Sequence, residues 1–293
     1  MEVKINEPMK RHTSFRTGGP ADWFAVPENV CELSAVLSAC KKAGADWYVI
    51  GKGSNLLVSD EGFRGVIIST EKLDKLAVSG QIITAGAGVL LSKAASAALK
   101  AGLTGLEFAS GIPGSVGGAA VMNAGAYGSE MKDVLKNVTV LTGDGEVRVI
   151  PAEELELGYR TSSILKNRYL VLEAEFLLKE GEREAIRGRM DELALKRREK
   201  QPLEYPSAGS TFKRPEGYFA GKLIEDAGLK GFSVGGAQVS EKHAGFVINR
   251  DNAAASDIYS LCMEVRKKVF EQTGVLLEME VKLLGPFGED EKQ

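Results

Sequence analysis

The sequence has few of the residues that cross-link small proteins or bind metal ions. Its 293 residues include three cysteines, Cys31, Cys40 and Cys262, and two histidines, His12 and His243. The cysteines are scattered and never in C-x-x-C spacing, which argues against a disulfide framework and a zinc site. Two histidines are too few for a histidine-rich metal site. We therefore expect no metal, and chemistry that uses an organic cofactor or carboxylates, cations and hydroxyls.

Long apolar runs and a large charge imbalance are also absent. No apolar stretch approaches the roughly 20 residues that cross a bilayer. The N-terminal residues lack the apolar region of a signal peptide. A formal net charge of −3 gives no basic field for nucleic acid or an anionic membrane. These absences predict a cytoplasmic protein that binds neither nucleic acid nor membrane.

The sequence does have the composition of an ordinary globular protein, with 44% hydrophobic and 26% charged residues. Helical spacing and strand-like runs predict an α+β fold. We expect helices over 30–40, 89–102, 182–200, 218–231 and 255–274, strands over 47–50, 65–69, 82–88, 169–178, 245–249 and 275–285, and a hairpin over 138–150. The polar tail over 287–293 is expected to fray.

The composition changes near residue 200, which predicts two domains. The first covers 1–200, with subdomains of about 1–60 and 61–200. The second covers 201–293, and its last strand is expected to return toward the first domain.

Two glycine-rich segments are the main candidates for a ligand site. Residues 51–55, GKGSN, follow a strand and suit either a nest of N–H groups around a phosphate or a tight turn between strands. Leu56 stands where G-x-G-x-x-G has its third glycine, and no helix of sufficient length follows, so a Rossmann site is not indicated. Residues 109–128 combine glycines with Pro113 and apolar side chains, which favours a ligand-lining loop over a linker. Because neither segment contains G-K-[ST], we expect an extended phosphate-bearing cofactor rather than a P-loop nucleotide.

Several motifs together resemble the UDP-N-acetylenolpyruvoylglucosamine reductase family of flavoenzymes, often called MurB. They occur in family order along almost the whole chain: HTSFRTGGPA (12–21), GKGSNLL (51–57), GIPGSVGGA (111–119), MNAGAYG (122–128), GYRTS (158–162), AGSTFKRP (208–215), GKLIEDAGLKG (221–231), HAGFVIN (243–249) and LEMEV (277–281). Each motif is weak by itself. Nine motifs in the family's order make a chance similarity to this family improbable.

The resemblance implies a two-part FAD-binding domain of the vanillyl-alcohol-oxidase (PCMH) type and a smaller α+β substrate-binding domain. It implies NADPH-dependent reduction of UDP-N-acetylglucosamine enolpyruvate to UDP-N-acetylmuramate, an oxidoreductase step of peptidoglycan synthesis that serves cell wall biogenesis, cell shape and cell division. The short interval between Arg160 and Ser210 resembles the form that lacks an inserted loop with a tyrosine. We expect a monomer.

The resemblance also assigns residues to the cofactor and to catalysis. Non-covalent FAD would be held by Gly51, Lys52, Gly53, Ser54, Asn55, Leu56, Gly111, Ile112, Pro113, Gly114, Ser115, Gly117, Gly118, Asn123, Gly125 and Ala126. Hydride would pass from flavin N5 to C3 of the substrate, and Ser210 would donate a proton to C2. Arg160 would bind the substrate carboxylate, and Glu280 would stabilise the enol form.

Each of these catalytic residues also has a simpler interpretation. Ser210 suits a plain turn and Arg160 a surface ion pair, while Glu278 and Glu280 share one face of the expected last strand and could both be solvated. Substrate contacts are expected from Tyr159, Lys213, Arg214, Lys222, His243 and Asn249, although a solvated charged surface explains several of these equally well. Arg214 departs from the family pattern, where an asparagine or another polar residue is expected.

Two other functions are compatible with the same residues. A related FAD-dependent alcohol oxidase would use the same type of flavin domain, and His12 is the one residue placed for a covalent flavin link. A non-catalytic nucleotide-sugar binding protein would use the same surface without turnover.

Overall fold

The computed structural model describes residues 1–288, so most of the tail for which fraying is predicted lies outside the described residues. The chain divides into two compact units. Unit 1 comprises Met1–Val3, Phe24–Lys52 and Val66–Arg197. Unit 2 comprises Lys4–Trp23, Gly53–Gly65 and the described residues from Arg198 onward. Two N-terminal segments therefore cluster with the C-terminal part of the chain. The division into domains of 1–200 and 201–293 stays a prediction.

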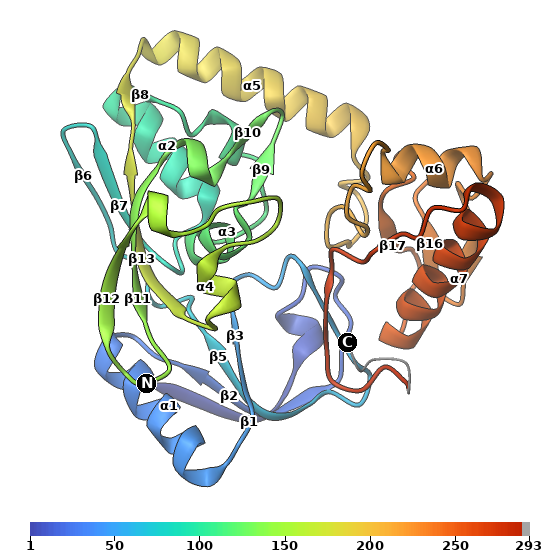
Figure 1. Ribbon diagram of the computed structural model, residues 1–293, viewed down its shortest axis with the longest axis horizontal. Helices are drawn as coiled ribbons and strands as arrows, with labels where there is room; N and C mark the ends of the chain where they lie inside the picture. The colour runs from blue at the N-terminus through green and yellow to red at the C-terminus, as the bar shows by residue number, and fades with distance from the viewer. Residues whose placement is uncertain (289–293) are drawn as a thin grey trace. The chain divides into compact units, whose positions relative to one another are not determined.

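Unit 1 contains most of the regular structure (Figure 1). Its helices are α1 (Val30–Ala43), α2 (Leu91–Ala101), α3 (Val116–Met122), α4 (Ser163–Lys166) and α5 (Arg183–Lys200), the last of which ends beyond the unit. Its strands are β3 (Trp47–Ile50), β6 (Leu76–Ser79), β7 (Ile82–Gly86), β8 (Leu103–Thr104), β9 (Gly125–Ala126), β10 (Ser129–Glu130), β11 (Leu135–Leu141), β12 (Val147–Pro151), β13 (Leu170–Leu177) and β14 (Lys179–Glu180). Three strands have residues in both units: β1 (Glu2–Pro8), β2 (Pro20–Val26) and β5 (Phe63–Ser69).

A five-stranded sheet forms the framework of unit 1, in the order β12-β11-β13-β7-β6. All of its pairings are antiparallel, and β11 with β12 confirms the hairpin predicted around Asp144-Gly145. The α2 and α3 helices pack against this sheet and bury an apolar core that includes Ile83, Leu91 and Phe176, each without solvent exposure. This core supports the loop before α3, where cofactor residues are predicted.

The α1 helix shows how local sequence sets the element boundaries. The Asn29 side chain accepts a hydrogen bond from the Glu32 amide, which caps the N-terminus. Gly44 ends the helix with a φ of 61°, a left-handed conformation that glycine adopts without strain. Leu33, Val36 and Cys40 lie on one face and are buried, as the helical spacing predicts.

Unit 2 combines segments from both ends of the chain. Its helices are α6 (Ala220–Asp226) and α7 (Ala255–Thr273), and its strands are β4 (Leu56–Val58), β15 (Ser233–Val234), β16 (Ala237–Val239), β17 (Val247–Asn249) and β18 (Lys282–Leu284). Strand β18 pairs in parallel with β4, with Lys282 opposite Leu56. Phe15 and Leu57 lie in the same apolar core as Ile258 and Val265 of α7. The core of unit 2 therefore needs residues from the beginning and the end of the chain.

The last strand is shorter than the sequence predicts. Alternation over 275–285 predicts one strand, but the observed strand β18 covers only Lys282–Leu284. The residues before it are extended and make a single bridge, from Met279 to Phe212.

Asp60 joins the 53–65 segment to the N-terminus of α7. Its carboxylate accepts hydrogen bonds from the Ala255 and Ser256 amides at 2.8 and 2.9 Å. Partial burial acts to raise the pKa of the Asp60 carboxyl, but the hydrogen bonds from Ser256 and Ala255 outweigh it and hold the pKa below its ordinary value. A lowered pKa means that the folded protein favours the ionised form. Its contribution to stability is therefore present above the ordinary carboxyl pKa and is lost as the pH falls below it.

Replacing Asp60 should therefore destabilise the fold in a pH-dependent way. We expect Asp60→Ala to lower the free energy of unfolding by about 1 kcal/mol near neutral pH, because two helix N–H groups lose their acceptor. Urea unfolding at a series of pH values measures this, with exposed Glu61→Gln as the matched control. The difference from wild type should shrink below about pH 4, where Asp60 becomes protonated. An equal unfolding midpoint for Asp60→Ala and wild type at pH 7 would contradict the capping role.

Candidate functional site

The first predicted cofactor segment lies against the second within unit 1. At Gly51, an added Cβ would lie 2.1 Å from the Ser115 Oγ, so only glycine allows this approach. The Ser115 hydroxyl is buried and has no hydrogen-bond partner within residues 1–288. Buried hydroxyls in folded proteins normally have a partner, so this one is suited to bind a group supplied from outside the chain.

The loop before α3 is fixed by backbone hydrogen bonds to the residues that precede α2. Leu91 N donates to Gly114 O at 3.0 Å, Val116 N to Val89 O at 2.8 Å, and Gly117 N to Ala87 O at 2.9 Å. A Cβ on Gly117 would lie 2.8 Å from the Ala87 Cβ. Most of the small residues here thus serve close backbone packing, while Gly111, Pro113 and Gly118 remain exposed.

Asn123 connects this glycine-rich segment to the loop that carries Arg160. It is completely buried, with a left-handed φ of 43°. Its amide nitrogen donates to the Gly158 carbonyl at 3.0 Å and to the Glu130 carboxylate at 2.9 Å, while its oxygen accepts from the Lys132 amide. Asn123 therefore fixes the backbone two residues before Arg160.

Arg160 has an unusual backbone conformation, with a φ of 54°. Its guanidinium lies 5.1 Å from the ring centroid of Tyr159, which is 51% exposed. Just beyond it, Ser162 donates to the Val121 carbonyl of α3 at 2.7 Å and caps α4. Left-handed conformations of non-glycine residues are uncommon and concentrate at functional sites. The hydrogen bonds of Asn123 and Ser162 hold the backbone on either side of Arg160, and so keep it in this strained conformation.

Gly125 and Ala126 form strand β9, which pairs with β10 across a turn at Tyr127 and Gly128. A Cβ on Gly125 would lie 2.7 Å from the Glu130 Cβ, so this glycine serves the pairing. Tyr127 has a φ of 56° and is 38% exposed.

From Gly53 onward, the first predicted segment belongs to unit 2. Gly53 has a φ of 58°, and a Cβ there would lie 1.9 Å from the His12 carbonyl oxygen. The side chain of Asn55 donates to the Glu280 carbonyl at 3.2 Å, and its own carbonyl accepts from the Lys282 amide at 3.0 Å. Lys52 and Ser54 are at least partly exposed, whereas Leu56 is buried in β4. Asn55 therefore also supports the backbone that runs from Glu280 into β18.

Ser210 and Glu280 lie on neighbouring segments of unit 2 that pair antiparallel. Glu280 N donates to Thr211 O and Lys213 N to Glu278 O, both at 2.8 Å. Gly209 has a φ of 77°, a left-handed conformation that glycine adopts readily, and the Ser210 that follows it is exposed. The adjacent Thr211 is buried, and its hydroxyl accepts from the Val247 amide at 2.9 Å. Ser210 is thus an accessible hydroxyl on a firmly held backbone.

Glu278 and Glu280, which the sequence predicts to share one face, differ in exposure. Glu280 is only 9% exposed, whereas the Glu278 side chain is 68% exposed and pairs with Lys213 at 2.8 Å. The hydrogen bond and charge of Lys213 hold the pKa of the Glu278 carboxyl below its ordinary value. The two residues flank Met279, which forms an isolated bridge to Phe212, and their shared face stays a prediction.

Three predicted substrate-binding cations are already engaged with other groups of unit 2. Lys213 pairs with Glu278, and Lys222 pairs with Asp226 at 2.6 Å on the surface of α6. The Arg214 guanidinium lies 3.9 Å from the ring centroid of Phe219 and donates from Nε to the Tyr218 carbonyl at 3.3 Å. Surface ion pairs are weak, so these lysines can exchange a carboxylate for a phosphate at small cost.

His243 and Asn249 have structural contacts that sequence reasoning did not anticipate. Burial lowers the pKa of the His243 imidazole, which favours the neutral form, and its Nδ1 accepts from the Gly245 amide at 3.1 Å. Asn249 donates to the Phe15 carbonyl at 2.9 Å and accepts from the Ala253 amide at 2.8 Å. A role for either residue in substrate binding stays a prediction.

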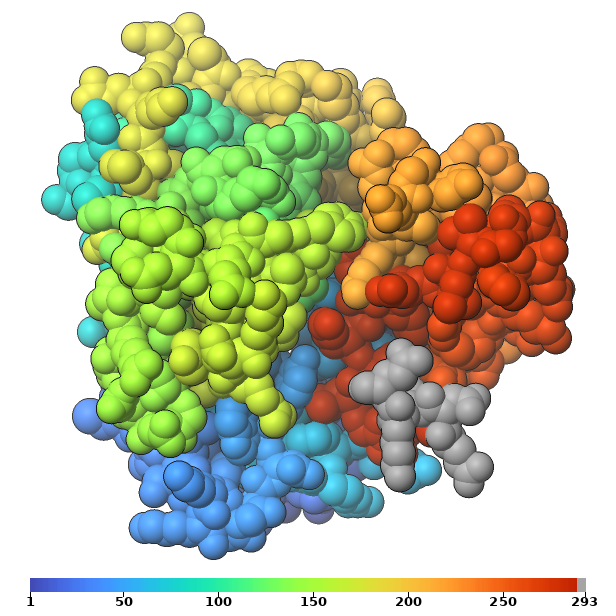
Figure 2. All heavy atoms as spheres, viewed as in Figure 1, coloured from blue at the N-terminus to red at the C-terminus, as the bar shows by residue number. Residues whose placement is uncertain are grey.

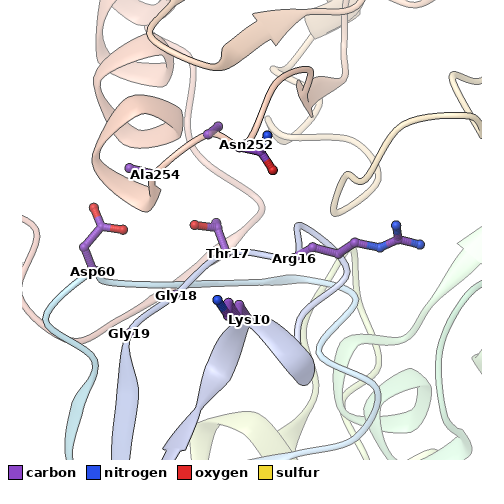
Figure 3. A pocket seen from close by; sticks show the side chains of 9 residues that line it. Lys10, Arg16, Thr17, Gly18, Gly19, Asp60, Asn252 and Ala254 are labelled. Carbon is purple, nitrogen blue, oxygen red and sulfur yellow. The ribbon is translucent and has the colours of Figure 1, made fainter.

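Unit 2 also contains an open cavity of about 330 Å³ that the sequence does not reveal. Figure 3 shows Asp60 beside Ala254 at the start of α7, with Thr17 directed toward it and Arg16 extending away. The lining residues are Lys10, Arg16, Thr17, Gly18, Gly19, Asp60, Asn252, Ala253 and Ala254. The Asp60 carboxylate in this cavity already caps α7, so we assign it no catalytic role.

No helix within residues 1–288 is long and apolar enough to span a membrane.

Two family models match the chain. One, described as an FAD binding domain, matches residues 21–150, which include the loops around Gly51 and Ser115. The other, described as the C-terminal domain of UDP-N-acetylenolpyruvoylglucosamine reductase, matches residues 201–284, which include Ser210 and Glu280.

Relatives of known name match over nearly the full length. The UDP-N-acetylenolpyruvoylglucosamine reductase of Clostridium novyi (strain NT) is 53% identical over 289 residues, covering 99% of this chain and 94% of the relative. That of Agathobacter rectalis is 55% identical, covering 96% of this chain and 94% of the relative. The crystal structure of the Thermus caldophilus enzyme (MurB) has a TM-score of 0.83 at 37% identity, covering 97% of this chain and 98% of that one. The chain therefore belongs to the UDP-N-acetylenolpyruvoylglucosamine reductase family.

Proposed function

We propose that this protein is the FAD-dependent reductase that converts UDP-N-acetylglucosamine enolpyruvate to UDP-N-acetylmuramate in peptidoglycan synthesis, with NADPH as reductant. The observation that carries the proposal is the combination of full-length family similarity with a cofactor loop that contains an unpartnered buried hydroxyl. The interval between Arg160 and Ser210 contains α4, β13, β14 and α5 in chain order. These elements fill most of the interval, which supports our assignment to the short form of the family without an inserted loop.

The residues around Ser115 fit an FAD cofactor. The Ser115 Oγ needs a hydrogen-bond partner, which FAD can supply because its phosphates, ribityl hydroxyls and flavin ring offer donors and acceptors. Gly51 approaches this hydroxyl at a distance that excludes any side chain, and the exposed Gly111, Pro113 and Gly118 leave backbone accessible. We therefore assign the predicted glycine-rich segments to FAD, bound non-covalently.

Bound FAD supplies the hydride that adds to C3 of the enolpyruvyl group. Addition at C3 leaves negative charge at C2 and on the adjacent carboxylate. In our proposal, Arg160 stabilises that charge, because a guanidinium offers a carboxylate two parallel donors. The strained backbone at Arg160 supports this role, since Asn123 and Ser162 fix the loop on either side.

Ser210 is proposed to complete the reduction by donating its hydroxyl proton to C2. An enolate carbon is a strong base, so even a weakly acidic hydroxyl can transfer its proton. The accessibility of Ser210 and the well-held backbone of Thr211 support this assignment. We propose that the buried Glu280 carboxyl steadies the enol form. The serine then regains its proton from solvent, which its exposure allows.

The proposed activity has a direct test in the purified protein. We expect a yellow protein whose flavin is reduced by NADPH and reoxidised only when the enolpyruvyl sugar nucleotide is added. Absorbance spectroscopy under anaerobic conditions follows both steps. Reoxidation by oxygen alone after reduction by an alcohol would indicate the oxidase alternative. A protein that stays colourless after FAD is added would leave only a binding function.

Gly51 provides a test of the cofactor loop. We expect Gly51→Ala to weaken FAD binding by at least about tenfold, because the new methyl group would overlap the Ser115 hydroxyl and displace the loop. FAD titration of the apoprotein, followed by quenching of flavin fluorescence, measures the change. Gly143→Ala is the matched control, since a Cβ there meets nothing within 4 Å. Unchanged FAD affinity in Gly51→Ala would place the cofactor elsewhere.

Ser210→Ala should separate the two half-reactions. We expect flavin reduction by NADPH at the wild-type rate, and reoxidation by substrate slower by about 10²–10⁴-fold, because only the second step needs the proton. Stopped-flow absorbance resolves the two rates. Ser207→Ala, three residues earlier in the same segment, is the control and should behave as wild type. Equal slowing of both half-reactions in Ser210→Ala would assign the hydroxyl a structural role.

A further inference from the structure

Helix α5 contains one cation whose position differs from that of its neighbours. Ile186, Met190 and Leu193 recur at helical spacing; Ile186 is buried, and Met190 and Leu193 pack on the core of unit 1. Arg197 continues the same face one turn later, so an arginine stands where the pattern calls for an apolar residue. The other charged residues of α5 are exposed, and Figure 2 shows this helix on the surface in yellow. Arg197, in contrast, is half-buried.

The Arg197 side chain contacts the cofactor loop. Its Nη1 donates a hydrogen bond to the Gly111 carbonyl, and its guanidinium carbon lies 5.8 Å from the ring centroid of Tyr127. A Cβ on Gly111 would lie only 3.0 Å from the Arg197 Nε. The absence of a side chain at residue 111 thus lets the guanidinium lie against the loop backbone.

The charge of Arg197 has no partner of opposite sign. No carboxylate within residues 1–288 pairs with it, although Arg189 and Lys196 on the same helix both pair with Glu192 at 2.5 Å. A half-buried cation without a counter-ion is costly unless an anion or strong acceptors surround it. Here the loop supplies one carbonyl and one aromatic ring, which leaves N–H donors and net charge for a ligand.

We propose that Arg197 is a positioning residue of the FAD site, which fixes the Gly111 carbonyl and the Tyr127 ring and contributes positive charge for an anionic cofactor. This inference rests on FAD being the cofactor of the proposed function. The FAD-binding match ends at residue 150, so Arg197 brings to the site a group from outside the matched domain. The planar guanidinium suits this role because it can bind a carbonyl, stack on an aromatic ring and still offer donors.

The test compares FAD affinity in matched variants of the full-length apoprotein. We expect Arg197→Gln to bind FAD about tenfold more weakly, and Arg197→Lys to recover part of that loss, because lysine keeps the charge but not the planar fork. Arg187→Gln removes an exposed cation from the same helix and should bind FAD as wild type does. The advantage of wild type over Arg197→Gln should decrease as salt is added, since the charge contribution is screened.

Thermal unfolding of each apoprotein separates binding from folding. Apoproteins with similar melting temperatures but different FAD affinities support the inference. If Arg197→Gln does not fold, Arg197→Lys decides, and FAD affinity equal to wild type in that variant overturns the inference. If wild type binds FAD and Arg197→Gln binds it equally well, the inference alone is wrong. If wild type does not bind FAD at all, the proposed cofactor is wrong and the inference falls with it.

Discussion

Close approach between backbone segments is the constraint on which both parts of the candidate site depend. In unit 1, Gly51 lies against Ser115 and Gly117 against Ala87 at distances that exclude a side chain. In unit 2, Gly53 lies against the His12 carbonyl under the same restriction. Glycine costs more entropy on folding than any other residue, so its concentration here indicates that contact distance matters more than local stability. Backbone hydrogen bonds help to hold the loops that result.

The sequence predicted the regular elements well where periodicity and capping residues agree. The α1 helix and its Gly44 cap, the hairpin of β11 and β12, and the long charged helix α5 are all observed. The final strand was predicted too long, because the residues before Lys282 make only an isolated bridge at Met279 and no ladder. The expectation that Glu278 and Glu280 share one face stays a prediction, although the two side chains differ in exposure.

The chemistry of the site was accessible from the sequence only through the family motifs. Glycine spacing indicated a phosphate-bearing cofactor, but not which one. The contacts of Asn123, Thr211 and Arg197 could not be predicted, because each depends on residues distant in the chain. A signal for Arg197 does exist, since a cation that interrupts the apolar face of an otherwise surface helix indicates a partner for that cation.

The composition of unit 2 has a consequence for how the protein is made. Phe15 and Leu57 lie in a core with residues of α7, β4 pairs with β18, and Asp60 caps α7. During synthesis, the segments that hold these N-terminal residues leave the ribosome long before their partners exist. Their apolar side chains stay without a core until nearly the whole chain has emerged, since contacts between distant residues form late. Nascent chains of this protein therefore expose apolar side chains at their N-terminal end, and β4 receives its partner β18 only when almost all of residues 1–288 have emerged.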